Sequence, residues 1–326
     1  MKTSPLNRSE SSSLISRRQF TAAALALGAA ALSRAADAPP SSAPCTFGFG
    51  TYGMKSLTAE QAIGILADIG FDSVMLDCSK GWDTDPANMP VARRADLRRL
   101  INDRGLRLPV LEDDLHPDPD DKKNAIEEEH LKELCQLCHD LSPDAPPIIE
   151  TMVGGKAEWS KIKPMFLKRL ESWAKIADSS QVTIAIKAHS GTSMYRVDQA
   201  IELFRELGSP SRIKLCYDYS HFVLTDQTMK QTIELALPWT VSVVMKDAVM
   251  EKGKRVFKLP GESGLIDYPA LLRQFYSGGY RGDFNCEISS MIWRKPGYDP
   301  IATAKQCYAN IAPAVVAAGV PRPVRK

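Results

Sequence analysis

The chain has 326 residues, of which 44% are hydrophobic and 25% are charged, and its formal net charge is +2. These proportions are typical of a globular protein with a sizeable core, and they exclude a disordered or fibrous chain. The near-neutral balance gives no electrostatic reason to expect nucleic acid or an anionic membrane surface as a partner. No apolar run approaches the ~20 residues that a membrane-spanning helix needs, so no membrane span is expected.

The N-terminal segment 1–38 predicts an export signal rather than part of the fold. The stretch SRRQFT at 16–21 precedes a short, weakly hydrophobic run at 22–32, and small residues at 36–38 offer a cleavage site. This order is typical of a twin-arginine signal; the alternative is a disordered tail with chance arginines. We therefore expect export to the periplasm and a mature domain at 39–326.

Beyond this segment, short β-branched or apolar runs alternate with longer runs of helical period. The runs predicted as strands are 46–51, 73–77, 107–111, 147–151, 182–188, 213–218, 240–246 and 283–288. One predicted helix begins with a capping box of Thr58 and Gln61 and ends at Gly70, and the last predicted helix covers 299–318. This succession of β-α repeats is typical of a single (β/α)8 barrel, or TIM barrel, of the α/β class.

A doubly wound α/β sheet is the alternative with the same alternation of elements. Such a sheet would carry a glycine-rich phosphate-binding turn after its first strand, and the glycines within 49–53 lack the required spacing. No linker or internal repeat divides 39–326. The sequence therefore favours one barrel domain.

The seven cysteines are odd in number and scattered, so they do not indicate a disulfide framework. Cys135 and Cys138 have C-x-x-C spacing, and His139 follows them. All three lie in a run of helical period, and no second pair of ligands occurs elsewhere. We therefore do not expect a zinc or redox site there.

In a (β/α)8 barrel the active site lies at the carboxyl ends of the strands. The polar residues at those ends are Asp77, Glu112, Asp113, Asp114, His116, Glu150, Lys187, His189, Asp218, His221, Lys246, Asp247 and Glu287. A lone acid at a strand end is usually a solvated loop residue or a helix cap. It is their joint occurrence at successive strands that indicates a site.

Segments of the second half of the chain carry a family resemblance. They are VTIAIKAH at 182–189, CYDYSH at 216–221, VVMKD at 243–247, PGESG at 260–264 and NCE at 285–287. In this order they resemble the xylose isomerase-like barrel family, the sugar and sugar phosphate isomerases and epimerases, over roughly 47–312. The resemblance implies a divalent metal held by Glu on the fifth strand, Asp on the sixth, His on the seventh and Glu on the eighth. The metal clamps neighbouring sugar oxygens, while the two glutamates move protons at a carbon next to a carbonyl group.

Asp218 and Glu287 match two of these metal ligands, and His221 matches a position that contacts the substrate. Two positions depart from the pattern. Lys187 stands in place of the fifth-strand Glu, and Val244 in place of the seventh-strand His. The chain therefore retains only half of the protein ligands that the resemblance implies.

We expect Lys187 to act as a built-in cation that pairs with Asp218 and Glu287, with no metal cofactor. An ammonium in place of the divalent ion and one carboxylate leaves the net charge of the site unchanged, whereas two carboxylates at ~4 Å without a cation would repel by about 4 kcal/mol. A charged ammonium also has no free lone pair for a metal. Two alternatives stay open: a structural ion pair, or a divalent metal such as Mn, Mg or Zn on these two acids and one histidine among His116, His189 and His221.

The expected catalytic residues are Glu287 as the base, Lys187, and His221, with the partner acid supplied by a histidine or by Lys187 itself. A Schiff-base role for Lys187 is disfavoured because two acids would keep it protonated. Lys246 and Asp247 are expected to form a salt bridge that orders the seventh-strand loop. The residues expected to bind substrate are Glu150, His189, Asp218, Lys258 and Trp293.

The sequence thus predicts an exported isomerase or epimerase that abstracts a proton next to a carbonyl group of a free or oxidised sugar. A keto-sugar lyase or hydratase would begin with the same step, and a non-catalytic sugar-binding protein would account for the missing ligands. A zinc nuclease built on the same barrel is disfavoured, because it needs many histidines and the chain has five. The expected partner is a small-molecule sugar, and the sequence leaves the oligomeric state open.

Overall fold

The computed structural model describes Met1 and residues 43–324. It contains a closed barrel of parallel strands in the order β1-β10-β7-β6-β5-β4-β3-β2, which confirms the predicted (β/α)8 barrel. The strands are β1 (Thr46–Gly50), β2 (Ser73–Asp77), β3 (Arg107–Glu112), β4 (Ile148–Thr151), β5 (Ile184–Lys187), β6 (Ile213–Asp218), β7 (Thr240–Met245) and β10 (Asp283–Cys286). Their ends differ from the predicted ones by at most two residues. The predicted export signal lies outside the described residues.

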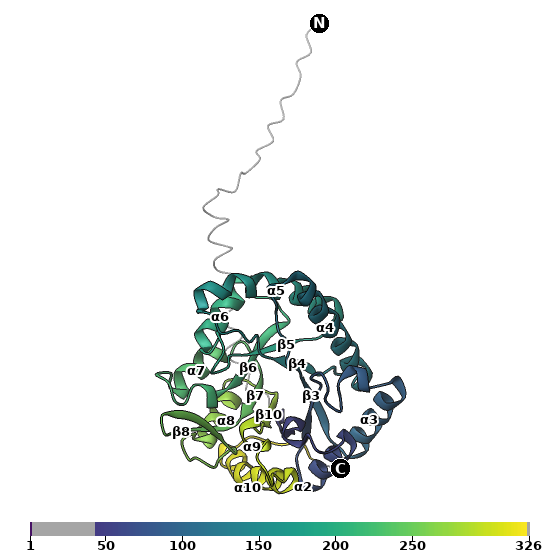
Figure 1. Ribbon diagram of the computed structural model, residues 1–326, viewed down its shortest axis with the longest axis vertical. Helices are drawn as coiled ribbons and strands as arrows, with labels where there is room; N and C mark the ends of the chain where they lie inside the picture. Colours follow the sequence, from purple (N-terminus) through teal and green to yellow (C-terminus); the bar gives the residue numbers. More distant parts are fainter. Residues whose placement is uncertain (2–42, 325–326) are drawn as a thin grey trace. The chain divides into compact units, whose positions relative to one another are not determined.

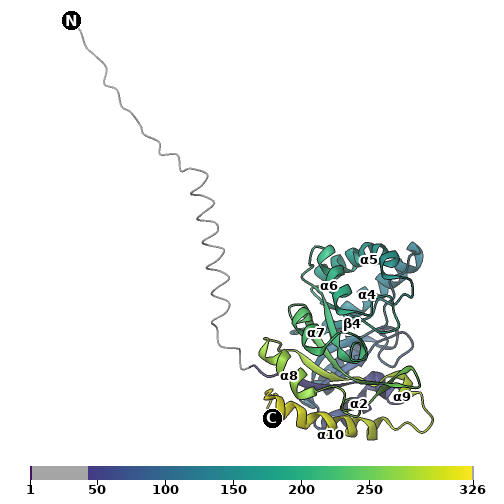
Figure 2. The same ribbon diagram turned by 90° about the vertical axis from the view of Figure 1, so that its left-hand side faces the viewer.

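Helices surround the strand ring (Figure 1). They are α2 (Ala59–Ile69), α3 (Val91–Asp103), α4 (Asp121–Leu141), α5 (Trp159–Ser180), α6 (Val197–Glu206), α7 (Met229–Ala236), α8 (Tyr268–Ser277) and α10 (Pro300–Ala318). Shorter helical segments are η1 (Thr51–Met54), η2 (Pro86–Asn88), η3 (Tyr219–His221) and α9 (Ser290–Trp293). The last helix, α10, packs against both α8 and α2 and so closes the ring (Figure 2). Within the described residues, no helix combines the length and the apolar character needed to cross a membrane.

Local sequence signals fix the ends of α2. The predicted capping box is present: the Thr58 side chain accepts from the backbone N–H of Gln61, and the Gln61 side chain accepts from that of Thr58. Gly70 ends the helix with a φ of 115°, a left-handed conformation that favours glycine. These two signals set where β2 begins and hence where its terminal residue, Asp77, reaches the rim of the barrel.

The cysteine pair on α4 faces the hydrophobic core. Cys135 and Cys138 are buried free thiols, as are the other five cysteines of the chain. Burial raises the pKa of the Cys138 thiol well above its usual range, so it holds its proton. The pair therefore behaves as part of the packing between α4 and the barrel.

The two-residue period of the strands sets which side chains face the barrel interior. Ala185, Cys216 and Val244 pack together from β5, β6 and β7, apart from the larger core between strands and helices. Residues two positions later face the same interior, one layer nearer the carboxyl ends. Those residues are Lys187, Asp218 and Lys246. The fold thus places two ammonium groups and a carboxylate in one layer.

One element was not expected from the sequence, an antiparallel hairpin of β8 (Asp247–Glu251) and β9 (Lys254–Lys258). Its turn at 252–253 has positive φ at both residues, 49° and 74°, as tight two-residue hairpins require. The Arg255 guanidinium donates a hydrogen bond to the backbone oxygen of Ser220. The hairpin is therefore tied to the segment that follows β6.

Asp283 is a buried acid at the start of β10. Its Oδ1 accepts hydrogen bonds from the hydroxyls of Thr46 at 2.6 Å and Ser73 at 2.5 Å, whereas its Oδ2 has no hydrogen-bond partner among the described residues. Burial raises the pKa of Asp283 to about 7. The folded state therefore favours the protonated form, so this group stabilises the fold most below its usual pKa and loses that effect as the pH rises through about 7.

We expect Asp283→Asn, which resembles the protonated carboxyl, to remove this pH dependence. In urea unfolding, the free energy of unfolding of the variant should fall less than that of the wild type, by roughly 2–3 kcal/mol between about pH 5 and about pH 8. Asp299→Asn, at the exposed N-cap of α10, is the control and should leave the pH slope as it is. Parallel pH profiles for wild type and Asp283→Asn would contradict the assignment.

Candidate active site

A cavity of about 960 Å³ lies at the carboxyl ends of the barrel strands. Several of the site residues expected from the sequence line it, namely Glu150, Lys187, His189, Glu287 and Trp293. Charged side chains thus form its floor, where the strands end. The cavity has the size and the mixed lining of a small-molecule site.

Trp293 belongs to a group of three aromatic rings on the cavity wall. Its ring centroid lies 5.5 Å from that of Tyr52 and 5.9 Å from that of Trp82, both in edge-to-face geometry. The ammonium of Lys55 lies 4.1 Å from the Trp82 ring centroid. This wall offers apolar ring surface beside the charged floor.

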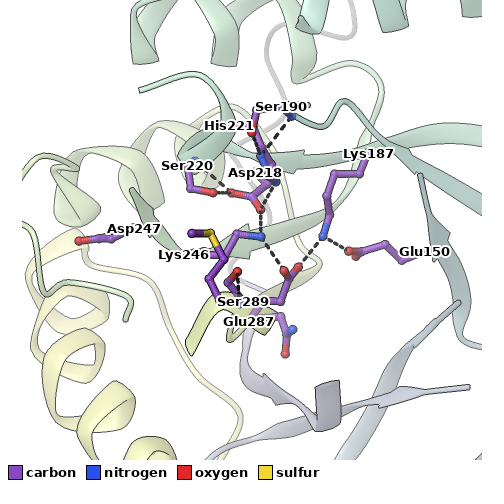
Figure 3. A network of polar contacts seen from close by, with 12 residues as sticks. Glu150, Lys187, Ser190, Asp218, Ser220, His221, Lys246, Asp247, Glu287 and Ser289 are labelled. Atoms are coloured by element: carbon purple, nitrogen blue, oxygen red, sulfur yellow. Dashed lines mark hydrogen bonds and ion pairs between the residues drawn. The ribbon is translucent and has the colours of Figure 1, made fainter. Parts of the chain in front are cut away.

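Lys187, at the end of β5, lies between two glutamates (Figure 3). Its Nζ is 2.5 Å from Oε2 of Glu287 and 2.9 Å from Oε1 of Glu150, and Glu150 also accepts a hydrogen bond from the Ser242 hydroxyl. The ion pair with Glu287 is the one expected from the sequence. The expected pairing with Asp218 is wrong, because the second partner of Lys187 is Glu150 on the neighbouring strand β4.

A second buried lysine, Lys246, follows β7 and contacts Asp218. Its Nζ is 2.5 Å from Oε1 of Glu287 and 3.1 Å from Oδ2 of Asp218. The expected salt bridge between Lys246 and Asp247 is wrong, because the partners of Lys246 are Asp218 and Glu287. Asp247 accepts a hydrogen bond from the Tyr268 hydroxyl at 2.6 Å instead and lies apart from the cluster (Figure 3).

The register of β7 explains why Lys246 was missed as a site residue. The resemblance aligned the family's seventh-strand histidine with Val244, which packs inside the barrel one layer below the site. Lys246 lies two positions later on the same face, in the layer of Lys187 and Glu287. The alternation of Ser242, Val244 and Lys246 was the signal that could have placed it there.

Asp218 and His221 lie beneath the cavity wall. Both are fully buried, and neither is among the residues that line the cavity. Nε2 of His221 is 3.2 Å from Oδ2 of Asp218, its Nδ1 is 2.8 Å from the Ser190 hydroxyl, and Asp218 accepts a hydrogen bond from the Ser220 hydroxyl. The expected contacts of Asp218 and His221 with substrate do not fit this geometry, in which Asp218 contacts Lys246 and His221 contacts Asp218.

The two lysines keep Glu287 ionised. Burial alone would raise the pKa of Glu287, but the ammonium groups of Lys187 and Lys246 outweigh it and lower the pKa to about 2. Burial also opposes the charge of Lys187, yet Glu150 and Glu287 hold the pKa of Lys187 well above its usual range. Against burial, Asp218 and Glu287 likewise raise the pKa of Lys246. The floor of the cavity is therefore a network of paired charges.

The histidines of the site are neutral. Burial lowers the pKa of His189 to about 2 and that of His221 to about 4, and the ammonium of Lys246 adds to the effect on both. A neutral imidazole holds no extra proton at physiological pH, so neither ring fits the expected role of partner acid. His189 still lines the cavity, which fits a contact with substrate.

Glu112, at the end of β3, is a site residue whose importance the sequence did not reveal beyond its strand-end position. One oxygen of Glu112, one of Glu150 and one of Glu287 all lie within 4.8 Å of one another. Burial, and next the charge of Glu287, raise the pKa of Glu112 well above its usual range. Burial and the neighbouring charge thus favour the protonated form of Glu112, close to the ionised Glu287.

The residues do not fit a divalent metal at the position that the family resemblance implies. Lys187 and Lys246 place two ammonium groups in that layer, and both contact Glu287. Glu112, Glu150 and Glu287 could reach a common ion, yet the Lys187 ammonium already lies within 2.9 Å of two of them. At ~4 Å from that ammonium, an ion would meet a repulsion of about 4 kcal/mol for each of its charges.

Two further residues expected at the site lie away from it. Lys258 pairs with Glu251 across the hairpin at 2.8 Å and is not among the residues that line the cavity, so its expected contact with substrate does not fit. His116 has an exposed side chain, 3.7 Å from Asp114, and it does not line the cavity either. Since Asp218 is fully buried, His116 cannot join it in a metal site.

Comparisons with protein families and solved structures show what the barrel is similar to. No curated protein sequence matches the chain, whereas the model of the xylose isomerase-like TIM barrel family matches residues 63–308. Among solved structures, an L-ribulose 3-epimerase is 20% identical with a TM-score of 0.64, over 84% of this chain and 96% of that one. The 3-keto-D-glucoside 4-epimerase from E. coli is 11% identical with a TM-score of 0.63, over 81% and 98%. The IOLI protein with a bound zinc atom is 16% identical with a TM-score of 0.66, over 84% and 98%. At these identities the similarity shows a shared fold.

Proposed function

The chain belongs to the xylose isomerase-like TIM barrel family, and on that premise we propose that it is a sugar isomerase or epimerase. The proposed reaction begins with the removal of a proton from a carbon next to a carbonyl group. Two of the structurally similar proteins are named as epimerases of L-ribulose and of a 3-keto-D-glucoside, which supports a free or oxidised sugar as substrate.

The observation that carries the proposal is the position of Glu287. Its carboxylate lies at the floor of the cavity with one lysine ammonium 2.5 Å from each oxygen. It is therefore ionised and fixed in place, as a general base must be before it can accept a proton. Its low pKa makes it a weak base until one of the ammonium groups turns to the substrate.

In the proposed mechanism, Lys187 is the ammonium that turns to the substrate and so makes Glu287 more basic. When the substrate carbonyl oxygen accepts a hydrogen bond from the Lys187 ammonium, the ammonium holds Glu287 less tightly and the carboxylate becomes more basic. The same ammonium then stabilises the negative charge that develops on the carbonyl oxygen as the proton leaves carbon. Lys246 stays on Asp218 and Glu287 and keeps the carboxylate oriented.

In the proposed mechanism the lysines take the electrostatic role that a metal has in the family, and no step involves a metal. The raised pKa of Lys187 also argues against a Schiff base, because a protonated amine cannot attack a carbonyl carbon. A keto-sugar lyase would begin with the same proton removal, so it shares this site. We place the reaction outside the cytoplasm on the strength of the twin-arginine pattern in 1–38.

The test is proton exchange in deuterated water with a panel of free and 3-keto sugars, followed by NMR. We expect deuterium to enter a carbon next to a carbonyl group with the wild type, and Glu287→Gln to lower the rate by about 10³-fold or more. Glu171→Gln, an exposed change on α5, is the matched control and should exchange at the wild-type rate. Sugar binding without exchange by the wild type would instead indicate a non-catalytic sugar-binding protein.

A further inference from the structure

Glu112 differs from Glu150, Asp218 and Glu287 in having no cation of its own. Glu150, Glu287 and Asp218 each lie within ion-pair distance of a lysine. No hydrogen bond or ion pair reaches the Glu112 carboxyl from any residue between 43 and 324, and its Oε2 is buried without a partner. A carboxyl in that position is stabilised by keeping its proton.

Asp77 on the neighbouring strand β2 strengthens the preference of Glu112 for its protonated form. Asp77, at the end of β2, is in register with Glu112 and lines the same cavity. It is 1% exposed, and its Oδ2 also lacks a hydrogen-bond partner in the described part of the chain. Two buried carboxyls side by side, with no cation on either, would repel each other strongly if both were ionised. Burial accordingly raises the pKa of Asp77 to about 7.

We infer that Glu112 is the proton donor of the proposed reaction. Glu287 deprotonates the carbon next to the carbonyl group, and Glu112 protonates the carbonyl oxygen. The inference rests on the proposed function and names the acid that the neutral histidines do not supply. The spacing of the two glutamates supports it. A base and an acid on opposite faces of one carbon, each ~3 Å from it, would stand ~6 Å apart. Oxygens within 4.8 Å of each other suit two adjacent atoms on one side of the sugar.

The proposed step balances in protons and electrons. Glu287 takes the proton from carbon, the electron pair of that C–H bond forms a C=C bond, and the carbonyl π pair moves onto oxygen, which takes the proton of Glu112. The product is a neutral enediol, with Glu287 protonated and Glu112 ionised. In the second half, Glu112 takes a hydroxyl proton and Glu287 returns a proton to the former carbonyl carbon. Both side chains then regain their starting states.

Glu112→Gln tests the inference, because the amide keeps the shape and polarity of the protonated carboxyl but cannot give up a proton. We expect kcat to fall by about 10²- to 10⁴-fold with little change in KM. Deuterium exchange at carbon should fall less than net conversion, since Lys187 still stabilises the first intermediate. The activity of the wild type should fall at alkaline pH, where Glu112 ionises. This alkaline limb should be absent from the pH profile of the residual activity of Glu112→Gln. Glu112→Asp should recover part of kcat and restore the alkaline limb.

Asp77→Asn distinguishes proton donation from a packing role. Removing the neighbouring charge should shift the alkaline limb of the wild-type profile to lower pH, because Glu112 then ionises more easily. The inference is overturned if Glu112→Gln retains the wild-type kcat and pH profile while Glu287→Gln is inactive. It is also overturned if Asp77→Asn leaves the limb in place. Absence of exchange by the wild type with every sugar would instead remove the proposed function itself.

Discussion

Lys187→Met is expected to destabilise the folded barrel by about 3–5 kcal/mol and to lower kcat by about 10³-fold or more. The side chain is 6% exposed and contacts two acids that are at least as buried, so the variant leaves Glu150 and Glu287 without their shared cation. Burial then raises the pKa of Glu287 above its value in the wild type, while Lys246 still contacts one of its oxygens. Urea unfolding and steady-state kinetics at several pH values measure both losses.

The chain offers a matched control in Lys163. Its ammonium also bridges two glutamates, Glu202 at 2.8 Å and Glu206 at 2.7 Å, but it does so on the outer surface between α5 and α6. Solvent screens such pairs, so Lys163→Met should be far less destabilising and should not affect kcat. Equal losses in the two variants would show that the burial of Lys187 has no special role. The stability defect of Lys187→Met should also shrink on acidification, since protonated glutamates no longer need a cation.

Lys187→Glu combined with Lys246→His is expected to create a binding site for one divalent ion. The double variant removes both ammonium groups and offers the Glu, Asp, His and Glu set of the family resemblance, together with Asp218 and Glu287. At ~4 Å and an effective dielectric near 20, each removed positive charge changes the interaction with each charge of the ion by about 4 kcal/mol, so the affinity for Mn²⁺ should rise by about 10³-fold or more. Metal content after purification without chelator, and titration calorimetry with Mn²⁺, measure the change.

The control is Lys187→Gln with Lys246→Gln, which removes the same charges but adds neither a carboxylate nor an imidazole. It should bind Mn²⁺ much more weakly than the Glu/His variant. One equivalent of tightly held divalent ion in the wild type would contradict the role that we assign to the lysines. Failure of the Glu/His variant to bind Mn²⁺ would show that the barrel layer no longer has the shape of a metal site.

The barrel was predictable because its strands are buried on both sides. Runs such as 182–188, in which only Thr183 and Lys187 are polar, are mostly apolar, as is typical of parallel strands that helices cover. Their ends could be located within two residues, and this was enough to place Lys187 at the rim. The presence of a cation at the site therefore followed from sequence alone.

The partners of Lys187 could not be predicted from the sequence, because they depend on distances between side chains of different strands. Lys187 reaches Glu150 on the adjacent strand, and Asp218 is already held by Lys246. The protonation of the histidines was equally hidden, since it depends on burial and on the nearby ammonium groups. The hairpin after β7 could have been found from the alternation of 247–258 around Lys-Gly.

A centre built only from side chains is complete as soon as the polypeptide has folded. In the proposed mechanism the lysine-glutamate network needs no loading step, no metallochaperone and no inorganic supply, so a chelator should not inhibit the enzyme. A relative that relies on a bound ion stops working where that ion is scarce. An enzyme with this network would keep working in such surroundings, and it would pay for that independence with a fold less tolerant of change at Lys187 and Lys246.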